Sequence, residues 1–174
     1  MILNYMKSNI YEEGKMDKSL ALRRAFGKFA TGVAVVTTSG PDGSPYGLTI
    51  NSFSSVSLEP PLVLWSLTNK SPNLDIYRNA SHFAINILST GQREISNTFA
   101  TRTEDRFAKI DWFRGLADLP VIRGTIATFE CRRTMTIEAG DHVVFFGAVE
   151  ECEQTDLEPL VFFSGQYGTT NLAG

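Results

Sequence analysis

Short apolar runs rich in β-branched and aromatic residues recur along the chain, and they constrain the fold more than any other feature. Runs of this length and composition are typical of strands. The segments between them do not alternate as βαβ units require. We therefore expect a mainly β (α+β) protein: a closed, mostly antiparallel barrel of six to seven strands with two or three peripheral helices. The principal runs are residues 33–38 (VAVVTT), 62–67 (LVLWSL), 82–88 (HFAINIL), 125–136, 142–152 and 160–167.

A helix is predicted at the start of the folded region. Ser19 is a suitable N-cap, and Leu22, Phe26 and Phe29 follow at helical spacing on one face. Gly32 is the residue at which we expect this helix to end.

Other local signals fill in the remaining connections. The Asp42-Gly43 pair predicts a hairpin between residues 33–38 and 46–51. Ser71 followed by proline predicts a short helix that runs to about residue 79. Residues 90–100 carry apolar positions at helical spacing and form a third expected helix, whereas residues 101–118 are expected to be an irregular loop.

Length and charge limit the classes of function. The 174 residues fit one domain, which we expect at residues 19–174, after an N-terminal arm of residues 1–18 that is mobile or held by a partner subunit. The net charge of −3 gives no basic excess for nucleic acid or an anionic membrane. No apolar run approaches the ~18 residues that span a bilayer, and the first residues lack the order of a signal peptide. We expect a cytoplasmic protein.

The ligand types that zinc prefers are scarce. Cys131, Cys152, His82 and His142 have no metal-ligand spacing, so no metal site is expected. Two buried structural thiols are the simpler interpretation of the cysteines.

Several catalytic motifs are also missing. The chain has no G-x-S-x-G, no phosphate-binding G-x-x-x-x-G-K-[ST] and no G-x-G-x-x-G. Without an evident nucleophile, acid–base pair or metal, any chemistry is expected to belong to a bound cofactor.

Residues 47–58 (GLTINSFSSVSL) break the strand alternation with polar residues where a core would need apolar ones. One interpretation is a solvent-facing strand, in which serine and threonine are ordinary. The other is the wall of a site for a flat, phosphorylated ligand, with Lys70 and Ser71 at a helix N-terminus attracting the phosphate. The donors for such a ligand would be Thr49, Asn51, Ser52, Ser54 and Ser55.

An ordered set of motifs strengthens the second interpretation. The chain contains ALRRAFGKFATGVAVVTT, GLTINSFSSVSLEPPLVLWSL, KSPN, FAINIL, DRF and EAGDHVVFFGAV in this order, from about Ala21 to Tyr167. The set resembles the short-chain flavin reductases, the reductase components of two-component flavin-dependent monooxygenases. That resemblance implies a split β-barrel of the FMN-binding type.

The resemblance also implies a function and a site. The implied reaction is hydride transfer from NADH or NADPH to FMN or FAD, with reduced flavin released to a separate monooxygenase and a homodimer carrying each flavin near the subunit boundary. His142, in the GDH motif, would lie beside the nicotinamide. The implied flavin contacts are Thr31, Gly32, Val33, Thr49, Asn51, Ser52, Phe53, Ser54, Ser55, Lys70, Ser71, Asn86 and Arg106.

Some of these residues have a purely structural alternative. His142 could be a structural histidine beside a strand, and Asn86 could pin a strand end. Arg106 could form a surface ion pair with Glu104 or Asp105, and Tyr167 is expected to plug the barrel rather than bind a ligand.

Two other functions remain open at this stage. One is a split-barrel flavoprotein that holds FMN tightly and acts as an oxidase or as a nitro, quinone or ferric reductase. The other is a non-catalytic module that binds a flavin or a tetrapyrrole.

Overall fold

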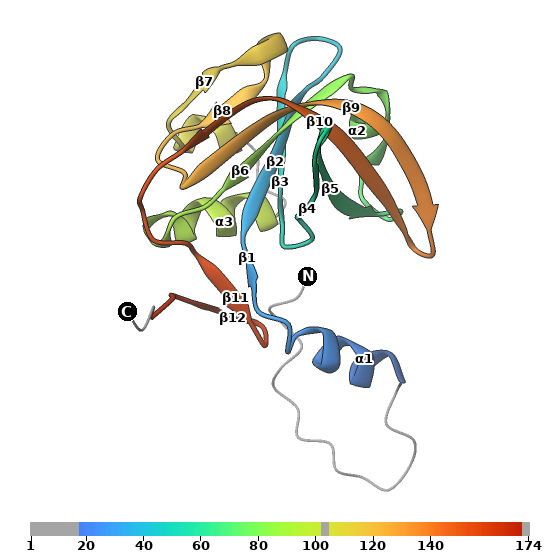
Figure 1. Ribbon diagram of the computed structural model, residues 1–174, viewed down its shortest axis with the longest axis vertical. Coiled ribbons are helices and arrows are strands. Elements are labelled where there is room, and N and C mark those ends of the chain that lie inside the picture. The colour runs from blue at the N-terminus through green and yellow to red at the C-terminus, as the bar shows by residue number, and fades with distance from the viewer. Residues whose placement is uncertain (1–17, 102–104, 172–174) are drawn as a thin grey trace, which may run out of the picture.

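The main element of the fold is a curved seven-stranded sheet in which every neighbouring pair is antiparallel. The computed structural model describes residues 18–101 and 105–171. The strand order is β3-β2-β6-β9-β10-β5-β4 (Figure 1). These strands are β2 (Ala34–Ser39), β3 (Pro45–Ile50), β4 (Ser54–Leu58), β5 (Pro61–Thr68), β6 (His82–Ile87), β9 (Ala127–Ala139) and β10 (His142–Gln154).

Smaller elements flank this sheet. A three-stranded sheet lies with α1 at one end of the molecule (Figure 1), and a two-stranded sheet packs on the outer side of the main one. The small strands are β1 (Thr31–Gly32), β11 (Val161–Phe163), β12 (Gln166–Gly168), β7 (Trp112–Arg114) and β8 (Pro120–Ile122). The helices are α1 (Lys18–Phe26), α2 (Leu74–Asn79), α3 (Arg93–Ala100), η1 (Thr90–Gln92), η2 (Arg106–Lys109) and η3 (Leu116–Asp118).

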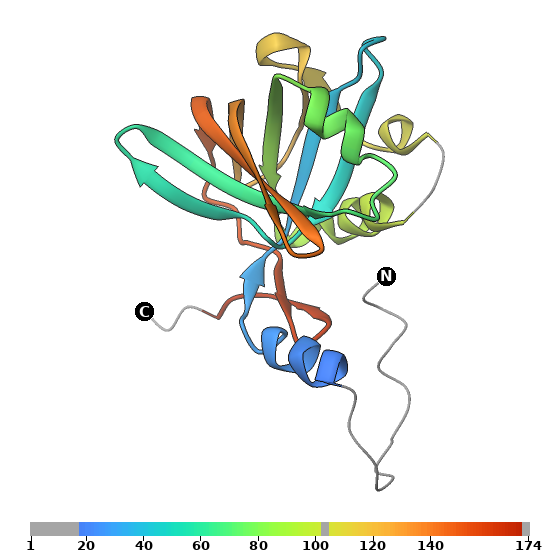
Figure 2. The same cartoon turned by 90° about the vertical axis from the view of Figure 1, so that its right-hand side faces the viewer.

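The barrel is split rather than closed, which corrects one expectation. The two edge strands, β3 and β4, follow each other in sequence but are not hydrogen-bonded to each other within the described ladders. Residues 51–53, which we call the edge crossing, carry the chain from one edge to the other. The β4–β5 hairpin forms one side of the sheet (Figure 2), with β5 paired to β10 from Leu62 to Thr68. Closure of the barrel would require pairing between β3 and β4, which the described ladders do not contain.

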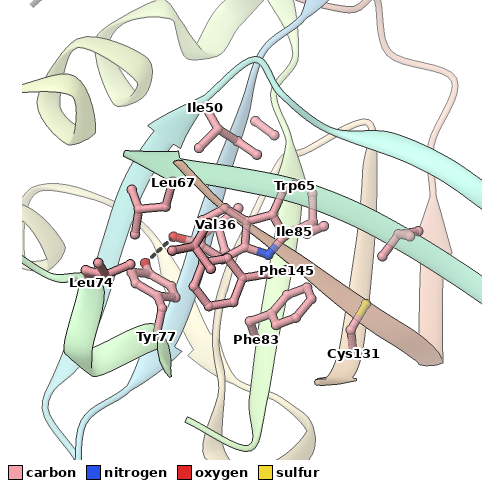
Figure 3. Packing of buried hydrophobic residues seen from close by; sticks show 13 residues of the cluster. Val36, Ile50, Trp65, Leu67, Leu74, Tyr77, Phe83, Ile85, Cys131 and Phe145 are labelled. Atoms are coloured by element: carbon pink, nitrogen blue, oxygen red, sulfur yellow. Dashed lines mark hydrogen bonds between the residues drawn. The ribbon is translucent and has the colours of Figure 1, made fainter. Parts of the chain in front are cut away.

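The barrel interior is filled by aromatic side chains (Figure 3). Trp65 of β5 stacks on Phe145 of β10 with ring centroids 4.5 Å apart, and both are fully buried. Tyr77 of α2 lies edge-on to Trp65 and donates a hydrogen bond of 2.8 Å to the Val36 carbonyl. Burial raises the pKa of the Tyr77 phenol, so the hydroxyl remains a donor. This core is the main source of stability, because a fully buried large apolar side chain contributes about 1.5–3 kcal/mol.

One half of the outer barrel surface is covered. Above β2 and β6, a second cluster is built from Val33, Val35, Leu88, Phe99, Ile122 and Leu160, and a third from Ala84, Leu119 and Val121. α3 and the β7–β8 pair therefore cover this side. The outer sides of β5, β10 and the second half of β9 have no such cover among the described residues.

The first helix differs from its prediction. It ends at Phe26, and the Gly27 amide donates to the Arg23 carbonyl, so Gly27 rather than Gly32 follows its last turn. Gly32 lies in β1, paired with Val161. Phe29 falls beyond the helix, and the expected apolar face is open: Phe26 and Phe29 are 72% and 78% exposed.

Other local predictions are confirmed or corrected in turn. The hairpin about residues 42–43 and the strands at 62–67 and 82–88 are confirmed. The short helix begins at Leu74 rather than after Ser71. The expected loop at 101–118 contains η2, β7 and η3, and residues 160–167 form a hairpin rather than one strand. Cys131 is buried, but Cys152 is exposed, which corrects the expectation of two buried thiols.

Candidate functional site

The edge crossing is held in place by two side chains. The Ser52 hydroxyl donates to the Ser66 carbonyl and accepts from the Ser66 amide, each at 3.1 Å. Phe53 turns into the barrel mouth and stacks on Phe129, with centroids 5.5 Å apart. Ser52 therefore continues the pairing between β4 and β5 beyond Ser54, and it fixes the crossing against β5.

With Ser52 and Phe53 turned inward, the other polar residues of the stretch face outward. Asn51, Ser54 and Ser55 are exposed. The Ser54 hydroxyl donates only to the neighbouring Ser55 carbonyl, at 3.1 Å. These groups are available to a ligand that lies against the crossing.

Residues 31–33 approach the crossing from the other edge. β2 pairs Ala34 with Ile50, so the chain before Ala34 runs beside the chain after Ile50. A Cβ placed on Gly32 would meet no atom of the described chain within 4 Å, so the space beside this residue is open. The Thr31 hydroxyl oxygen is buried and has no hydrogen-bond partner among the described residues. An unpaired buried hydroxyl costs free energy, and a polar ligand against β1 would remove that cost.

His142 lies farther along the same outer surface. It opens β10 opposite Thr68 of β5, and Val144 pairs with Ser66. Because alternate residues of a strand share a face, His142 and Val144 point the same way as Thr68 and Ser66. Ser52, Ser66 and Thr68 thus form a row of polar residues that extends from the edge crossing to His142.

The turn before His142 is fixed on the segment after β5. The backbone amide of Asn69 donates a hydrogen bond of 2.9 Å to the Asp141 carbonyl. The His142 Nδ1 lies 2.7 Å from the Asp141 carboxylate, and the His142 side chain is 45% exposed. The hydrogen bond and charge of His142, with a smaller effect of Lys70, lower the pKa of Asp141. Lys70 is therefore close enough to act electrostatically on this turn.

Four predicted residues have other roles in this structure. The Thr49 hydroxyl donates to the Ser96 carbonyl of α3 at 2.7 Å. Asn86 is fully buried and bonded on both ends of its amide, which is the strand-pinning role. The Arg106 guanidinium donates to the Gly47 carbonyl at 3.1 Å, on the side that α3 covers. Ser71 accepts from the Asn73 amide at 3.3 Å and starts the turn into α2.

Ser66 and Thr68 are absent from the residues predicted from the sequence. Ser66 is the polar residue inside the apolar run LVLWSL, which was the available signal. Tyr167, expected to plug the barrel, lies instead in the small sheet. There its hydroxyl is 2.8 Å from the Ser96 hydroxyl and its ring stands edge-on to Phe162.

Neither a metal cluster nor a membrane helix is found in the described residues. Across 18–101 and 105–171, no three His, Cys, Asp or Glu side chains are grouped so that they could hold a metal ion. Within the same ranges, no helix is long and apolar enough to cross a membrane.

The split sheet, the polar edge crossing and the polar residues that lead to His142 define a split-barrel protein with an open polar edge. Residues 26–171 match the family model described as the flavin reductase like domain. The chain therefore belongs to the flavin-reductase-like family.

Similar proteins also carry the names of flavin reductases or of monooxygenase reductase components. The chain is 45% identical over 152 residues to the FMN reductase (NADH) SmoA of Agrobacterium fabrum, covering 87% of this chain and 86% of that protein. It is 50% identical over 154 residues to a probable flavin reductase of Rhizobium meliloti, covering 88% of this chain but 50% of the relative. The chain thus spans about half the length of that relative. The chain is also 44% identical to the reductase component of a flavin-dependent trigonelline monooxygenase of Acinetobacter baylyi. That match covers 91% of this chain and 51% of the relative.

Solved structures share the fold. The NADH:FAD oxidoreductase SgcE6 of Streptomyces globisporus C-1027, solved in complex with NAD and FAD fragments, superposes with a TM-score of 0.84 at 35% identity. The match covers 93% of this chain and 97% of that one.

Proposed function

We propose that the chain is an NAD(P)H-dependent flavin reductase that reduces FMN or FAD and releases the reduced flavin to a separate monooxygenase. The observation that carries the proposal is the edge crossing: its exposed Asn51 and the adjoining Ser54 and Ser55 lie on the open edge of a split barrel. The relatives support it, since they include a protein named as an NADH-dependent FMN reductase and a monooxygenase reductase component.

The donors along the open edge fit a flavin. The hydroxyl and amide groups of residues 51–55 suit the polar rim of an isoalloxazine ring, and Thr31 offers a buried hydroxyl that lacks a partner. Lys70 supplies a cation for the flavin phosphate. The flavin, when bound, accepts a hydride from the reduced nicotinamide. The protein's part is to hold both reactants and exclude water.

His142 is proposed to contact the nicotinamide. Its ring is held by Asp141 through Nδ1, which leaves Nε2 directed away from that carboxylate and available to a carboxamide group. We assign a nicotinamide contact to this histidine and a flavin phosphate contact to Lys70, which lies beside the same turn.

A second copy of the chain is the proposed cover of the open outer sheet. Val143 and Phe145 of β10 are buried in the barrel, so the alternate residues Val144 and Phe146 face outward. On β9, Met135 and Ile137 are 48% and 44% exposed. An apolar sheet face of this extent is typical of an interface. Two copies related by a twofold axis would bury this face against itself and bring His142 near the subunit boundary.

Steady-state kinetics test the reaction. NADH and NADPH oxidation would be followed with FMN, FAD and riboflavin at equal enzyme concentration, on protein whose flavin content is measured after purification. The proposal expects turnover that saturates in added flavin. Binding of flavin without NAD(P)H oxidation would contradict it, and stoichiometric flavin retained through purification would favour a tightly bound prosthetic group instead.

Sedimentation tests the dimer. Ile137→Glu should shift the protein from dimer to monomer, because a charge in the middle of the apolar face resists desolvation. Lys109→Glu, on the exposed surface of η2, is the control that changes charge elsewhere. A wild-type chain that sediments as a monomer at micromolar concentration would exclude the proposed interface.

A further inference from the structure

A solvent-open cavity of about 420 Å³ lies on the surface at the end of the barrel opposite the edge crossing. β2 runs from the crossing to this cavity, with Ala34 at one end and Ser39 at the other (Figure 1). At about 3.3 Å per residue, the strand separates the two places by roughly 17 Å. None of the residues proposed to bind flavin or nicotinamide lines the cavity. Its volume lies within the range of small-molecule sites.

One wall of the cavity is held by an arginine clamp. The Ser39 hydroxyl donates to the Asp118 carbonyl at 2.7 Å, and the Arg114 guanidinium donates to the same carbonyl at 2.9 Å. The other guanidinium nitrogen of Arg114 donates to the Gly43 carbonyl at 2.8 Å. The clamp joins the β2–β3 turn to η3, so the shape of this wall does not depend on a ligand.

The same wall contains strained backbone. Ala117 (φ 51°) and Asp118 (φ 59°) both lie in the left-handed region, and neither is glycine. Such residues cost about 1–3 kcal/mol each and concentrate at binding sites, where the surrounding structure maintains them. Ala117 lines the cavity directly.

The opposite wall offers acceptors. Asp75 and Asn79 of α2 line the cavity and lie one turn apart on the same helix face. Neither side chain forms a hydrogen bond or ion pair with any residue that the structure describes. The arginines of this region are already engaged: Arg78 pairs with Glu138, and Arg133 donates to the Ala80 carbonyl.

Among the described residues that line the cavity, no unpaired cationic side chain is present to bind an anion. The His82 ring at the cavity has Nδ1 at 2.9 Å from the Ser81 hydroxyl and Nε2 at 3.5 Å from the Glu150 carboxylate. The rest of the lining includes the polar residues Thr38, Ser39 and Ser81 and the apolar residues Pro41, Ile76 and Leu119. The cavity thus combines an exposed carboxylate without a cationic partner among the described residues, an exposed amide and a mixed polar and apolar lining.

We propose that this cavity is a second binding site, which takes a small amphiphilic amine. The ammonium group donates to the Asp75 carboxylate and the Asn79 amide oxygen, and the aliphatic or aryl-alkyl body lies against Pro41, Ile76 and Leu119. The site is separate from the flavin-binding edge and does not rest on the proposed reductase activity.

Titration with three matched probes tests the proposal by calorimetry and amide chemical shifts. Phenethylamine should bind with shifts confined to residues 38–41, 75–82 and 117–119. Its neutral analogue 2-phenylethanol and its anionic analogue 3-phenylpropanoate should bind at least tenfold more weakly, since they lack the charge-assisted hydrogen bond. Equal binding of the three probes, or shifts elsewhere, would overturn the assignment.

Two substitutions with opposite expected signs complete the test. Asp75→Asn should weaken phenethylamine binding about tenfold, the loss of one charge-assisted hydrogen bond. Asn79→Asp should tighten it severalfold, a gain that no folding defect can imitate. Asp156→Asn, which removes an exposed carboxylate outside the cavity, should leave the affinity unchanged. The proposal fails if Asp75→Asn binds as the wild type does or if Asn79→Asp shows no gain.

Discussion

Asn86 and Asn51 are both polar residues at or beside apolar strands, and the structure predicts opposite consequences for their substitution. Asn86 is fully buried. Its Nδ2 donates to the Val35 carbonyl at 2.9 Å and to the Thr37 hydroxyl at 3.2 Å, and its Oδ1 accepts from the Ile122 amide at 2.9 Å. One side chain therefore joins β6 to β2 and to β8.

The expected cost of Asn86→Leu follows from these bonds. Leucine keeps the branched shape of asparagine but is larger and cannot form hydrogen bonds, so the variant loses all three bonds and adds some overpacking. The Ile122 amide and the Val35 carbonyl each lose the hydrogen bond to Asn86. Each buried group left unsatisfied lowers the free energy of unfolding by about 1–3 kcal/mol. A total of about 3 kcal/mol would lower Tm by roughly 6–12 °C for a domain of this size.

Urea unfolding followed by tryptophan fluorescence measures this loss. Asn86→Leu should lower the midpoint with an unchanged m-value. The control Asn97→Leu, at a half-buried residue, removes a solvent-exposed hydrogen bond of 3.3 Å to Glu94, and it should change the free energy of unfolding by less than about 0.5 kcal/mol. A wild-type midpoint for Asn86→Leu, together with weakened flavin binding, would refute the strand-pinning role and make Asn86 a ligand contact.

Asn51→Ala is the complementary case. Asn51 is exposed, so its removal should leave the unfolding midpoint unchanged. The flavin Kd should rise about tenfold, or about 1.4 kcal/mol. A flavin titration by fluorescence quenching measures the change, and an unaltered Kd would remove Asn51 from the site.

Three further predictions concern the charged turn and the thiols. His142→Ala should raise KM for NAD(P)H more than KM for flavin in steady-state assays, and equal effects would argue against a nicotinamide contact. The same variant should raise the pKa of Asp141 toward its usual value in a carbon NMR titration, because the His142 hydrogen bond is the largest cause of the lowered pKa. The stability that this pair contributes is present above the unfolded carboxyl pKa and is lost as pH falls through the lowered one. At pH 8 only Cys152 should react rapidly with a thiol reagent, since burial raises the pKa of Cys131 to about 12; fast modification of both thiols in the native protein would contradict this.

Local patterns account for the elements that the sequence predicted well. The strands at residues 62–67 and 82–88 follow from apolar, β-branched composition, and the first hairpin follows from Asp42 and Gly43 at its turn. Each of these signals lies within a few residues, so no tertiary information is needed to use it.

The features that escaped prediction depend on distant segments. The end of α1 could be placed at Gly27 or Gly32, and the choice depends on the pairing of Gly32 with Val161, far along the chain. Likewise, Asn86 and Asn51 look alike in sequence. Asn86 is covered because β8 packs against its face of the sheet, and nothing near residue 86 encodes that contact.

The two halves of the barrel surface explain why the predicted site divided as it did. Where α3 and β8 cover the outer face, polar side chains such as Thr49 and Asn86 are used to attach the cover, because a buried polar group must find a partner. On the uncovered half, Ser54, Ser55 and His142 remain exposed beside apolar residues. An amphipathic surface of that kind is unfavourable in water alone and suits a flat polar ligand held under a second subunit. The position of the cover, rather than the identity of the polar residues, therefore separates the structural donors from the candidate ligand contacts.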